Sequence, residues 1–437
     1  MVLHRPATPP MGWNSWDSYG TTVTEAEVLA NARFMAEHLL SHGWDTVVVD
    51  IDWADPNARA HGYNDDATLT IDAHGRLQPD PVRFPSSAGG AGFGPLAAQI
   101  HAMGLRFGIH IMRGIPRVAA AADLPVEGAD VTAGQVADAS NRCEWNPHYE
   151  GLTAAGAAAY YRSIVRLYAA WGVDFIKADD LLWPYQAADI EALSAAIDGV
   201  DRDITLSLSP GRHLSLAHAE HLRAHASMWR VCDDLWDRWD DVADNFARLA
   251  RWAPHAGDGA WPDGDMLPLG RIGLRAERGE PRDDQLTPDE RRTLLTLWAM
   301  ARSPLMVGGD LPTSDPATID LLQRDGLLEI ARSATASREL LRERDLVVWS
   351  ADDAAGTRWA AVFNLSDEPR TEPFDTRSLG LGAAPTDIVE VWSAAPVAVE
   401  AVHEQSHAAR SVAPGSSVVR VTLAPHGCVL LRAEGAS

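Results

Sequence analysis

The stretch Gly172-Val173-Asp174-Phe175-Ile176-Lys177-Ala178-Asp179-Asp180 predicts a short buried strand whose carboxyl end carries one ammonium and two carboxylates. Of the 37 basic residues in the chain, Lys177 is the only lysine. A compact ammonium suits single hydroxyl groups, whereas the planar arginine fork suits carboxylates and phosphates. The stretch indicates a binding site at a strand end, although a plain ion pair of Lys177 with Asp179 or Asp180 would also explain these residues.

On both sides of this strand, short apolar runs alternate with amphipathic helical patterns between residues 10 and 330. Such alternation is typical of βα units around a parallel sheet. Eight units can be counted, with strands expected at residues 11–13, 46–51, 107–112, 175–179, 205–209, 228–232, 261–267 and 304–308. We therefore predict the α/β class, with a (β/α)8 TIM barrel as the catalytic domain over residues 1–333.

Two helices of this region carry clear start signals. Thr24 with Glu27 and Thr287 with Glu290 have the spacing of a capping box, so each pair marks a helix N-terminus. After about residue 335 the helical period disappears, and alternating or β-rich runs are separated by turn residues. This pattern predicts a C-terminal antiparallel β-sandwich domain over residues 334–437.

The composition excludes several classes of partner. The formal net charge of -24 argues against nucleic acid and anionic membranes, which require basic patches. Three scattered cysteines without C-x-x-C spacing argue against disulfides and structural zinc. The N-terminus lacks an apolar leader and no long apolar stretch occurs, so we expect a soluble cytoplasmic protein. The oligomeric state stays open, with a homo-oligomer allowed.

Carboxylates gather where the predicted strands end, which is where a barrel of this type performs its chemistry. They are Asp50, Asp52, Asp179, Asp180, Asp233, Asp234, Asp263 and Asp265. A divalent metal site would use several of them as ligands, namely Asp50, Asp52, Asp179 and Asp263. Glycoside hydrolysis would use two, one as nucleophile and one as acid/base. Tryptophans beside the acidic strand ends favour a sugar: Trp13, Trp53, Trp183, Trp229, Trp236 and Trp261.

The motif Thr8-Pro9-Pro10-Met11-Gly12-Trp13-Asn14-Ser15-Trp16 resembles the opening signature of glycoside hydrolase family 27, which contains α-galactosidases and α-N-acetylgalactosaminidases. The resemblance continues, in order, through residues 49–53, 175–179, Trp229-Arg230 with Asp234, 263–267 and 297–305. It covers about residues 7 to 330. The family implies a (β/α)8 barrel followed by an antiparallel β domain, and a retaining double displacement without a cofactor or metal.

The resemblance also implies roles for individual residues. Asp179, two residues after Lys177, would be the nucleophile, and Asp234 would be the acid/base. Asp179 must be ionised, which Lys177 favours, and Asp234 must start protonated, which a less polar, Trp-rich surrounding would favour. Lys177 and Arg230 would bind sugar hydroxyls. The remaining substrate-binding candidates are Trp13, which would lie against the sugar, Asp50, which would accept from a hydroxyl at its non-reducing end, and Ile51, Asp52, His110, Ser209, Trp261 and Asp265.

Three positions depart from the family pattern. Ile51 follows Asp50 where the family has a second aspartate for the 4- and 6-hydroxyls of galactose, unless Asp52 or another loop residue supplies the contact. Ser209 has the small form found in N-acetylgalactosaminidases, although Arg212 stands where those enzymes leave room for the acetamide. His110 replaces a common tyrosine, and the disulfide beside the nucleophile is absent, in line with a reducing compartment.

We therefore expect a retaining exo-glycosidase acting on a small oligosaccharide or glycoside. It would remove a terminal α-D-galactopyranosyl residue or its analogue without C6, the β-L-arabinopyranosyl residue. An α-N-acetylgalactosaminidase and an isomaltodextranase-like α-glucan hydrolase are alternatives within the class. A metal-dependent barrel enzyme and a non-catalytic sugar-binding barrel are the alternatives outside it.

Overall fold

The computed structural model describes residues 5–383, 385, 387–401 and 417–434, and two compact units can be distinguished in it. The first unit holds the residues up to Leu235 together with Asp258–Asp284 and Leu305–Ile319. The second holds Trp236–Gly257, Gln285–Pro304 and the residues after Ile319. The domain boundary between residues 333 and 334 stays a prediction. Residues 1–4, on which the prediction about a leader partly depends, lie outside the described residues.

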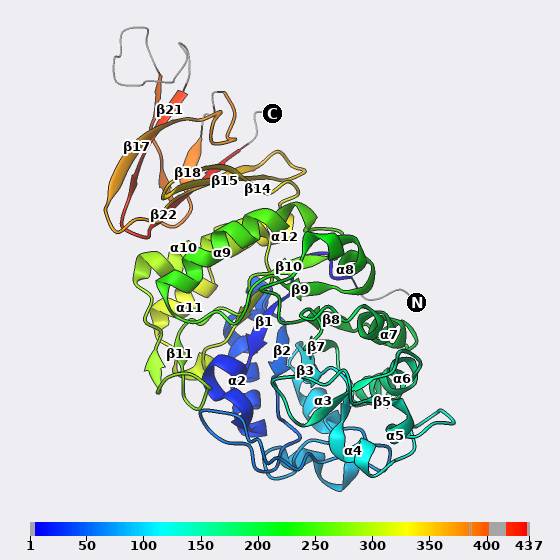
Figure 1. Cartoon of the computed structure of the whole chain (residues 1–437). Coiled ribbons are helices and arrows are strands. Elements are labelled where there is room, and N and C mark those ends of the chain that lie inside the picture. Colours follow the sequence, from blue (N-terminus) through cyan, green and yellow to red (C-terminus); the bar gives the residue numbers. More distant parts are fainter. Residues whose placement is uncertain (1–4, 384, 386, 402–416, 435–437) are drawn as a thin grey trace. The chain divides into compact units, whose positions relative to one another are not determined.

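Eight parallel strands form the centre of the first unit (Figure 1). They follow the order β10-β9-β8-β7-β3-β2-β1-β13. Their bounds are β1 (Met11–Asn14), β2 (Thr46–Val49), β3 (Arg106–Met112), β7 (Phe175–Asp179), β8 (Thr205–Leu208), β9 (Met228–Arg230), β10 (Trp261–Asp263) and β13 (Leu305–Val307). All eight predicted strands are confirmed, and the main difference is that β10 ends at Asp263 rather than continuing to residue 267.

The two edges of this sheet meet in the segment that follows β10. Leu267 forms a parallel bridge with Val307, because its N–H donates to Met306 at 2.8 Å and its carbonyl accepts from Gly308 at 2.9 Å. A sheet whose edges are joined has no exposed edge strand. The predicted (β/α)8 barrel is therefore confirmed.

Helices follow the barrel strands and surround them (Figure 1). In the first unit they are α1 (Trp16–Tyr19), α2 (Glu25–His38), α3 (Gly94–Ala102), α6 (Ala154–Trp171), α7 (Ala187–Asp198) and α8 (Ala219–His225). Both predicted capping boxes are present: Thr24 with Glu27 opens α2, and Thr287 with Glu290 opens α10 (Pro288–Ala301) of the second unit. The local signals therefore placed these two N-termini correctly.

Gly12 of β1 explains one residue of the opening motif. A Cβ at this position would lie 2.1 Å from the carbonyl oxygen of Thr46 on the neighbouring strand β2. No side chain fits at that distance, so the strands pair here only with glycine. The close pairing brings the ends of β1 and β2 together, which is where Asn14 and Asp50 meet.

The long connection after β3 is a folded insertion. It contains α4 (Arg117–Ala121), α5 (Ala133–Val136) and a small sheet of β4 (Ile115–Pro116), β6 (Tyr149–Leu152) and β5 (Ala137–Asp138). Loops of this length in compact domains are usually functional. Its first residue, Arg113, is bound to the residue that follows β7, as described below.

The second unit contains two antiparallel sheets. One comprises β14 (Arg338–Glu343), β15 (Leu346–Asp352), β16 (Arg358–Asn364), β22 (Cys428–Ala433), β18 (Ile388–Glu390) and β19 (Ala395–Pro396), and the other β17 (Arg370–Asp375), β21 (Ser417–Leu423) and β20 (Val399–Ala401). Val362 and Leu431 of the first sheet share a buried core with Phe374 and Val419 of the second. The predicted β-sandwich is confirmed.

Helices also belong to the second unit: α9 (Trp239–Trp252), α10 and α12 (Asp325–Ser333), while the residues of α11 (Pro316–Leu322) are divided between the two units. Phe246 of α9 packs edge-on against Phe363 of β16, with ring centroids 5.0 Å apart. Trp392 donates from Nε1 to Thr296 Oγ1 of α10 at 3.0 Å. The sandwich therefore packs against helices that the sequence pattern assigns to the barrel repeats.

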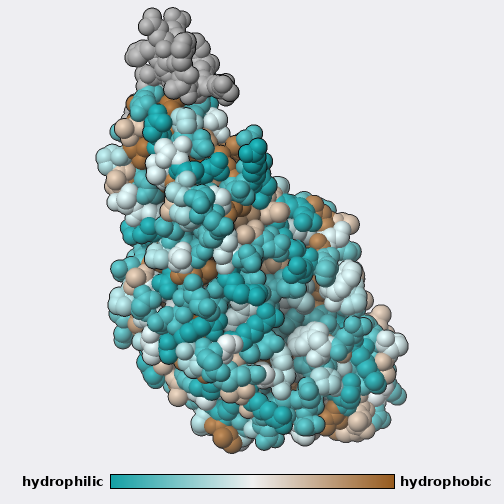
Figure 2. All heavy atoms as spheres, turned by 60° about the vertical axis from the view of Figure 1, so that its left-hand side comes forward, coloured by the Kyte–Doolittle hydropathy of each residue, from teal (hydrophilic) through white to brown (hydrophobic). Residues whose placement is uncertain are grey.

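The face of the molecule drawn in Figure 2 is mainly polar. Figure 2 shows hydrophilic residues over most of one face, with apolar residues scattered among them. Within the described part of the chain, each helix is too short or too polar to cross a membrane.

Asp17 of α1 is an unusual acid in the barrel. Its side chain is 1% exposed, and its Oδ2 has no hydrogen-bond partner. A Cβ at Gly308 would lie only 1.9 Å from that oxygen, so the carboxyl packs directly on the chain after β13. Burial, reinforced by the charges of Asp265 and Asp234, raises the pKa of Asp17 well above its usual value.

We expect Asp17→Asn to reduce the loss of stability with rising pH. A raised pKa in the folded state means that folding binds a proton, so stability is full below the ordinary Asp pKa of about 4 and falls as pH rises above it. The thermal midpoint should drop less between pH 5 and pH 8 in the variant than in the parent. Asp258→Asn, at a side chain that is 94% exposed, is the control. Equal drops in all three proteins would contradict the assignment.

Candidate active site

A small hollow opens at the carboxyl ends of the barrel strands. The residues that line it come from strands β3, β7 and β9, from the start of α1 and from the loops after β2, β8 and β9: Trp16, Asp50, Ile51, Tyr63, His110, Lys177, Asp179, Ser209, Pro210, Arg230 and Asp234. Eight of the twelve predicted site residues are therefore brought together here.

Lys177 and Asp50 form an ion pair across this mouth. Lys177 Nζ donates to Asp50 Oδ2 at 2.8 Å, and Asn14 Nδ2 donates to the same oxygen at 2.7 Å. The backbone N–H of Ile51 donates to the other carboxylate oxygen at 2.9 Å. Burial alone would raise the pKa of Asp50, but the charges of Lys177 and His110 and these hydrogen bonds lower it. Asp50 is thus an oriented, ionised acceptor.

Asp179 lies at the end of β7, beside His110 of the adjacent strand β3. His110 Nε2 is 3.4 Å from Asp179 Oδ2, and the N–H of Asp180 donates to Oδ1 at 2.8 Å. Burial would raise the pKa of Asp179, yet the hydrogen bond and charge of His110, together with Lys177 and the Asp180 N–H, lower it. The carboxylate is ionised and turned into the hollow, as a nucleophile requires.

Asp180, the neighbour of Asp179, points elsewhere. Arg113 holds its Oδ2 through Nε at 3.1 Å and Nη2 at 2.8 Å, and both side chains are buried. Arg113 Nη1 also donates to the carbonyl of Asn141 in the insertion after β3. The backbone of Asp180 is left-handed, with φ of 64°. This buried pair fixes the turn that presents Asp179.

Arg230 of β9 joins two carboxylates. Nη1 lies 2.7 Å from Asp265 Oδ1, and Nη2 donates to Asp234 Oδ1 at 3.1 Å. Asp265 is also fixed by the N–H of Leu235, at 2.7 Å from Oδ2. The side chain of Asp234 is 43% exposed, so it faces a guanidinium and solvent rather than the less polar surrounding expected from the sequence. Asp265 therefore positions Arg230, and Arg230 positions Asp234.

Ile51 and Ser209 line the hollow with different properties. Ile51 is 3% exposed and presents an apolar side chain beside Asp50. Ser209 is equally buried, and its Oγ has no hydrogen-bond partner within the protein. A buried hydroxyl without a partner is costly unless something binds to it. Ser209 is thus available to a ligand hydroxyl.

Four predicted site residues do not line the hollow. Trp13 is fully buried and its Nε1 donates to the Gly309 carbonyl, so it does not offer a face to a sugar. Trp261 is likewise fully buried, with Nε1 donating to the Pro6 carbonyl. Asp265 lies behind Arg230. Asp52 is not among the residues that line the hollow, and burial together with the Asp55 charge raises its pKa to about 6.

Trp16, Tyr63 and Pro210 line the hollow but were not selected from the sequence. Trp16 belongs to the quoted opening motif, so a signal for it existed. The Tyr63 ring lies 5.8 Å from that of Trp16 and 5.9 Å from that of Trp145 in the insertion. Tyr63 sits in an irregular loop without periodicity, and no sequence pattern identified it. Aromatic faces at the hollow therefore come from Trp16 and Tyr63 instead of Trp13.

The metal hypothesis required Asp50, Asp52, Asp179 and Asp263 to converge. Among the described residues, no three of these four bring carboxylate oxygens within 4.8 Å of one another. Lys177 already donates to the Asp50 carboxylate, and the Asp263 carboxylate accepts from the N–H of Asp265 at 2.9 Å. The arrangement of these four residues does not favour a shared cation.

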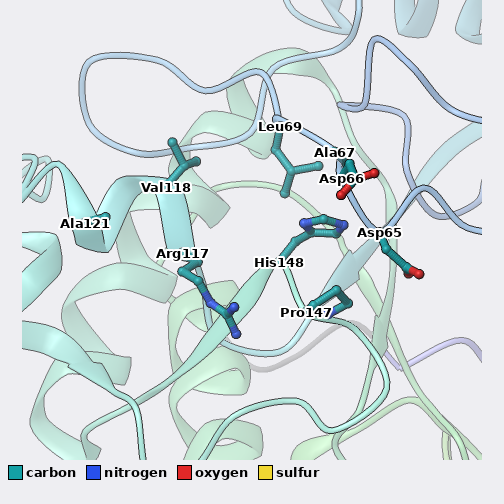
Figure 3. A pocket seen from close by; sticks show the side chains of 9 residues that line it. All are labelled: Asp65, Asp66, Ala67, Leu69, Arg117, Val118, Ala121, Pro147 and His148. Atoms are coloured by element: carbon teal, nitrogen blue, oxygen red, sulfur yellow. The ribbon is translucent and has the colours of Figure 1, made fainter.

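A second hollow lies apart from these residues, between residues 65–69 and the insertion after β3 (Figure 3). The side chains of Leu69, Arg117 and His148 gather around it (Figure 3). Arg117 is bound to Glu150 at 3.0 Å, and His148 Nε2 is 2.9 Å from the Asn64 carbonyl. None of the predicted site residues reaches this hollow.

Comparison with known proteins agrees with this geometry. Residues 8–140 and 148–333 match the family described as alpha galactosidase A, and residues 343–433 match the alpha galactosidase C-terminal beta sandwich domain. The chain belongs to glycoside hydrolase family 27. It is a glycoside hydrolase of the α-galactosidase type, and the resemblance found in its motifs is confirmed.

Individual relatives in family 27 differ in the activity named for them. A β-L-arabinopyranosidase of Geobacillus stearothermophilus, with arabinose bound, is 41% identical at a TM-score of 0.91, with 99% of this chain and 98% of that chain covered. A putative α-N-acetylgalactosaminidase of Bacillus halodurans is 39% identical at a TM-score of 0.85, with both chains fully covered. The Gallus gallus α-N-acetylgalactosaminidase is 28% identical over 74% of this chain and 70% of its own length.

We expect Arg113→Ala to destabilise this glycoside hydrolase by about 3–5 kcal/mol, because it leaves the buried Asp180 carboxylate without its partner. Activity should fall as well, since the Asp180 N–H orients Asp179. Arg142→Ala is the matched control: Arg142 is half exposed, its ion pair with Glu150 is worth about 0–1 kcal/mol, and it lies in the same insertion. Urea unfolding of both variants measures the difference, and equal losses would refute it.

Proposed function

We propose that this family 27 enzyme is a retaining exo-glycosidase that removes terminal β-L-arabinopyranosyl residues from small glycosides. The observation that carries the proposal is Ile51, an apolar side chain in the hollow directly after the oriented acceptor Asp50. β-L-Arabinopyranose has the skeleton of α-D-galactopyranose without the C6 hydroxymethyl group. A site with no acceptor near C6 suits the sugar that has no hydroxyl there.

The position of Asp52 supports the same choice. Asp52 was the residue best placed in the sequence to replace the missing acceptor, but it is not among the residues that line the hollow. Among the described residues lining the hollow, Asp50, Asp179 and Asp234 are the carboxylates. Two of these are proposed for the chemical steps, so Asp50 is the acceptor left for sugar hydroxyls.

The Geobacillus relative supports the assignment independently. It is named a β-L-arabinopyranosidase, and it aligns over nearly all of this chain with 41% identity. The α-galactosidases of plants and fungi are more distant, for example the Cyamopsis tetragonoloba enzyme at 24% identity over 399 residues.

In the first proposed step, an oxygen of Asp179 attacks the anomeric carbon and the glycosidic C–O bond breaks. Asp234 transfers its proton to the departing oxygen, and a covalent glycosyl ester forms. His110 and Lys177 keep Asp179 ionised before the attack.

In the second step, Asp234 accepts a proton from water, the water oxygen attacks the anomeric carbon and the ester bond to Asp179 breaks. Two displacements return the original anomeric configuration. Lys177 and Arg230 donate to ring hydroxyls, and Ser209 Oγ offers a further polar contact. Trp16 and Tyr63 supply the apolar surface against the C–H face of the ring.

An α-N-acetylgalactosaminidase is the second candidate, and Ser209 is the observation that favours it. A small residue there leaves room beside the sugar, and the Bacillus halodurans relative is described as a putative enzyme of that kind. Arg212 does not line the hollow and its side chain is 50% exposed, 3.9 Å from Asp233. Turnover of p-nitrophenyl α-N-acetylgalactosaminide, compared with that of p-nitrophenyl β-L-arabinopyranoside, separates the two candidate functions.

The cellular location and the oligomeric state of the enzyme stay predictions. Cys143, Cys232 and Cys428 are all free, which supports the expected reducing compartment and cytoplasmic location. A homo-oligomer remains a hypothesis that light scattering can test.

The parent enzyme should prefer p-nitrophenyl β-L-arabinopyranoside over p-nitrophenyl α-D-galactopyranoside in kcat/KM. Ile51→Asp should shift this ratio toward the galactoside by about 10-fold or more, because it restores an acceptor for the C6 hydroxyl. Ile51→Val keeps the site apolar and should leave the preference with the arabinoside. A parent preference for galactoside, or a ratio unchanged by Ile51→Asp in a folded variant, would overturn the assignment.

The roles of the two aspartates predict different kinetics in their variants. Asp179→Asn should lose about 10⁴-fold or more in kcat and show no burst, because no glycosyl-enzyme forms. Asp234→Asn should still release one equivalent of p-nitrophenolate in a burst, since this leaving group needs little acid assistance, and then turn over slowly. Stopped-flow absorbance distinguishes them. A burst in Asp179→Asn would falsify the nucleophile assignment.

A further inference from the structure

A histidine-rich segment outside the hydrolase site has no role in the chemistry above. His213, His218, His221 and His225 lie within 13 residues, whereas the whole chain has 16 histidines. The last two belong to α8 and are separated by four positions, so they lie on the same face of that helix. α8 packs beside α7 on the outer ring of the barrel (Figure 1).

Glu191 of α7 faces this pair of histidines. Within the described ranges, one group of three histidine, cysteine, aspartate or glutamate side chains has all its potential ligand atoms within 4.8 Å of one another. This group consists of Glu191, His221 and His225. His221 Nε2 is 3.1 Å from Glu191 Oε1, and the rings of His221 and His225 are 4.6 Å apart. Two ligands at about 2.0–2.1 Å from a tetrahedral zinc ion stand about 3.3 Å apart. The side chains are therefore close to metal-binding geometry.

Tyr185 is hydrogen-bonded to the ring nitrogen of His221 that does not face Glu191. Its hydroxyl lies 2.6 Å from His221 Nδ1, and its ring stacks on His218 with centroids 3.7 Å apart. A ligating histidine usually bonds through its other ring nitrogen to a fixed polar group, which sets the tautomer. With the proton on Nδ1, His221 donates to the Tyr185 oxygen and leaves Nε2 free for a metal.

We propose that Glu191, His221 and His225 bind one divalent first-row transition-metal ion of the Zn²⁺ type and thereby clamp α7 to α8. Two imidazoles and one carboxylate suit Zn²⁺, whereas Mg²⁺ and Ca²⁺ prefer sites made of oxygen ligands only. Three protein ligands leave a fourth position for water. Because α7 follows the loop of Tyr185, which itself follows the Asp179 strand, the clamp stabilises the scaffold behind β7.

The test uses the full-length, tag-free enzyme, stripped with EDTA and titrated with ZnCl₂ by calorimetry and with CoCl₂ by visible absorption. We expect one Zn²⁺ per chain, a rise in the thermal midpoint, and Co²⁺ bands in the visible region. Tyr185→Phe removes a hydrogen-bond partner of a ligand and should weaken Zn²⁺ binding by roughly 10–100-fold. His221→Ala and His225→Ala each remove a ligand and should weaken Zn²⁺ binding by more than that.

His213→Ala is the matched control, because His213 lies in the same segment but packs against Trp183, with centroids 5.2 Å apart. It should bind Zn²⁺ as the parent does. Absence of Zn²⁺ binding in the parent, or unchanged binding in folded His225→Ala, would overturn the proposal, as would an equal affinity for Mg²⁺. Circular dichroism verifies folding. Glycosidase activity, measured in parallel, should be the same in His225→Ala and the parent without metal, so the metal site and the proposed function are tested separately.

Discussion

The ion pair of Lys177 with Asp50 is the interaction on which the geometry of the active site depends. It connects the ends of β7 and β2 across the strand that lies between them, β3, and the same Asp50 oxygen also binds Asn14 after β1. His110 of β3 pairs in register with Lys177 and reaches the next carboxylate, Asp179. Basic and acidic side chains thus alternate over neighbouring strand ends, so Asp50 and Asp179 are ionised and oriented before a sugar enters.

This alternation matters because burial of a carboxylate costs free energy unless a cation or hydrogen bonds compensate. Asp50 is compensated by Lys177, Asp265 by Arg230 and Asp180 by Arg113. Asp234 differs, since it is partly exposed and shares Arg230 with Asp265. The carboxylate proposed to change its protonation during the reaction is therefore the one that remains open to solvent, whereas the proposed nucleophile has fixed partners.

Two separate regions of the barrel carry the proposed sites, one at the carboxyl ends of the strands and one on the outer helices. The strand ends carry the sugar chemistry, while the outer helices α7 and α8 place Glu191, His221 and His225 together. The turn after β7 links both, because it contains Asp180, fixed by Arg113, and leads to Tyr185, which contacts His221. A constraint on α7 therefore acts on the same connection that presents Asp179.

The sequence by itself determined the eight βα units, the two capping boxes, the β-sandwich and the motifs of family 27, because these depend on local periodicity and on contiguous residues. Strand-end positions also identified Lys177, Asp50 and Asp179, and the family resemblance identified Arg230. Only the tertiary structure decided that Trp16 and Tyr63 replace Trp13 at the hollow, that Asp52 does not line it and that Asp234 is partly exposed. It also brought Glu191 of one helix to two histidines of another. These facts depend on loop paths and on packing between distant segments, for which a single sequence contains no periodic signal.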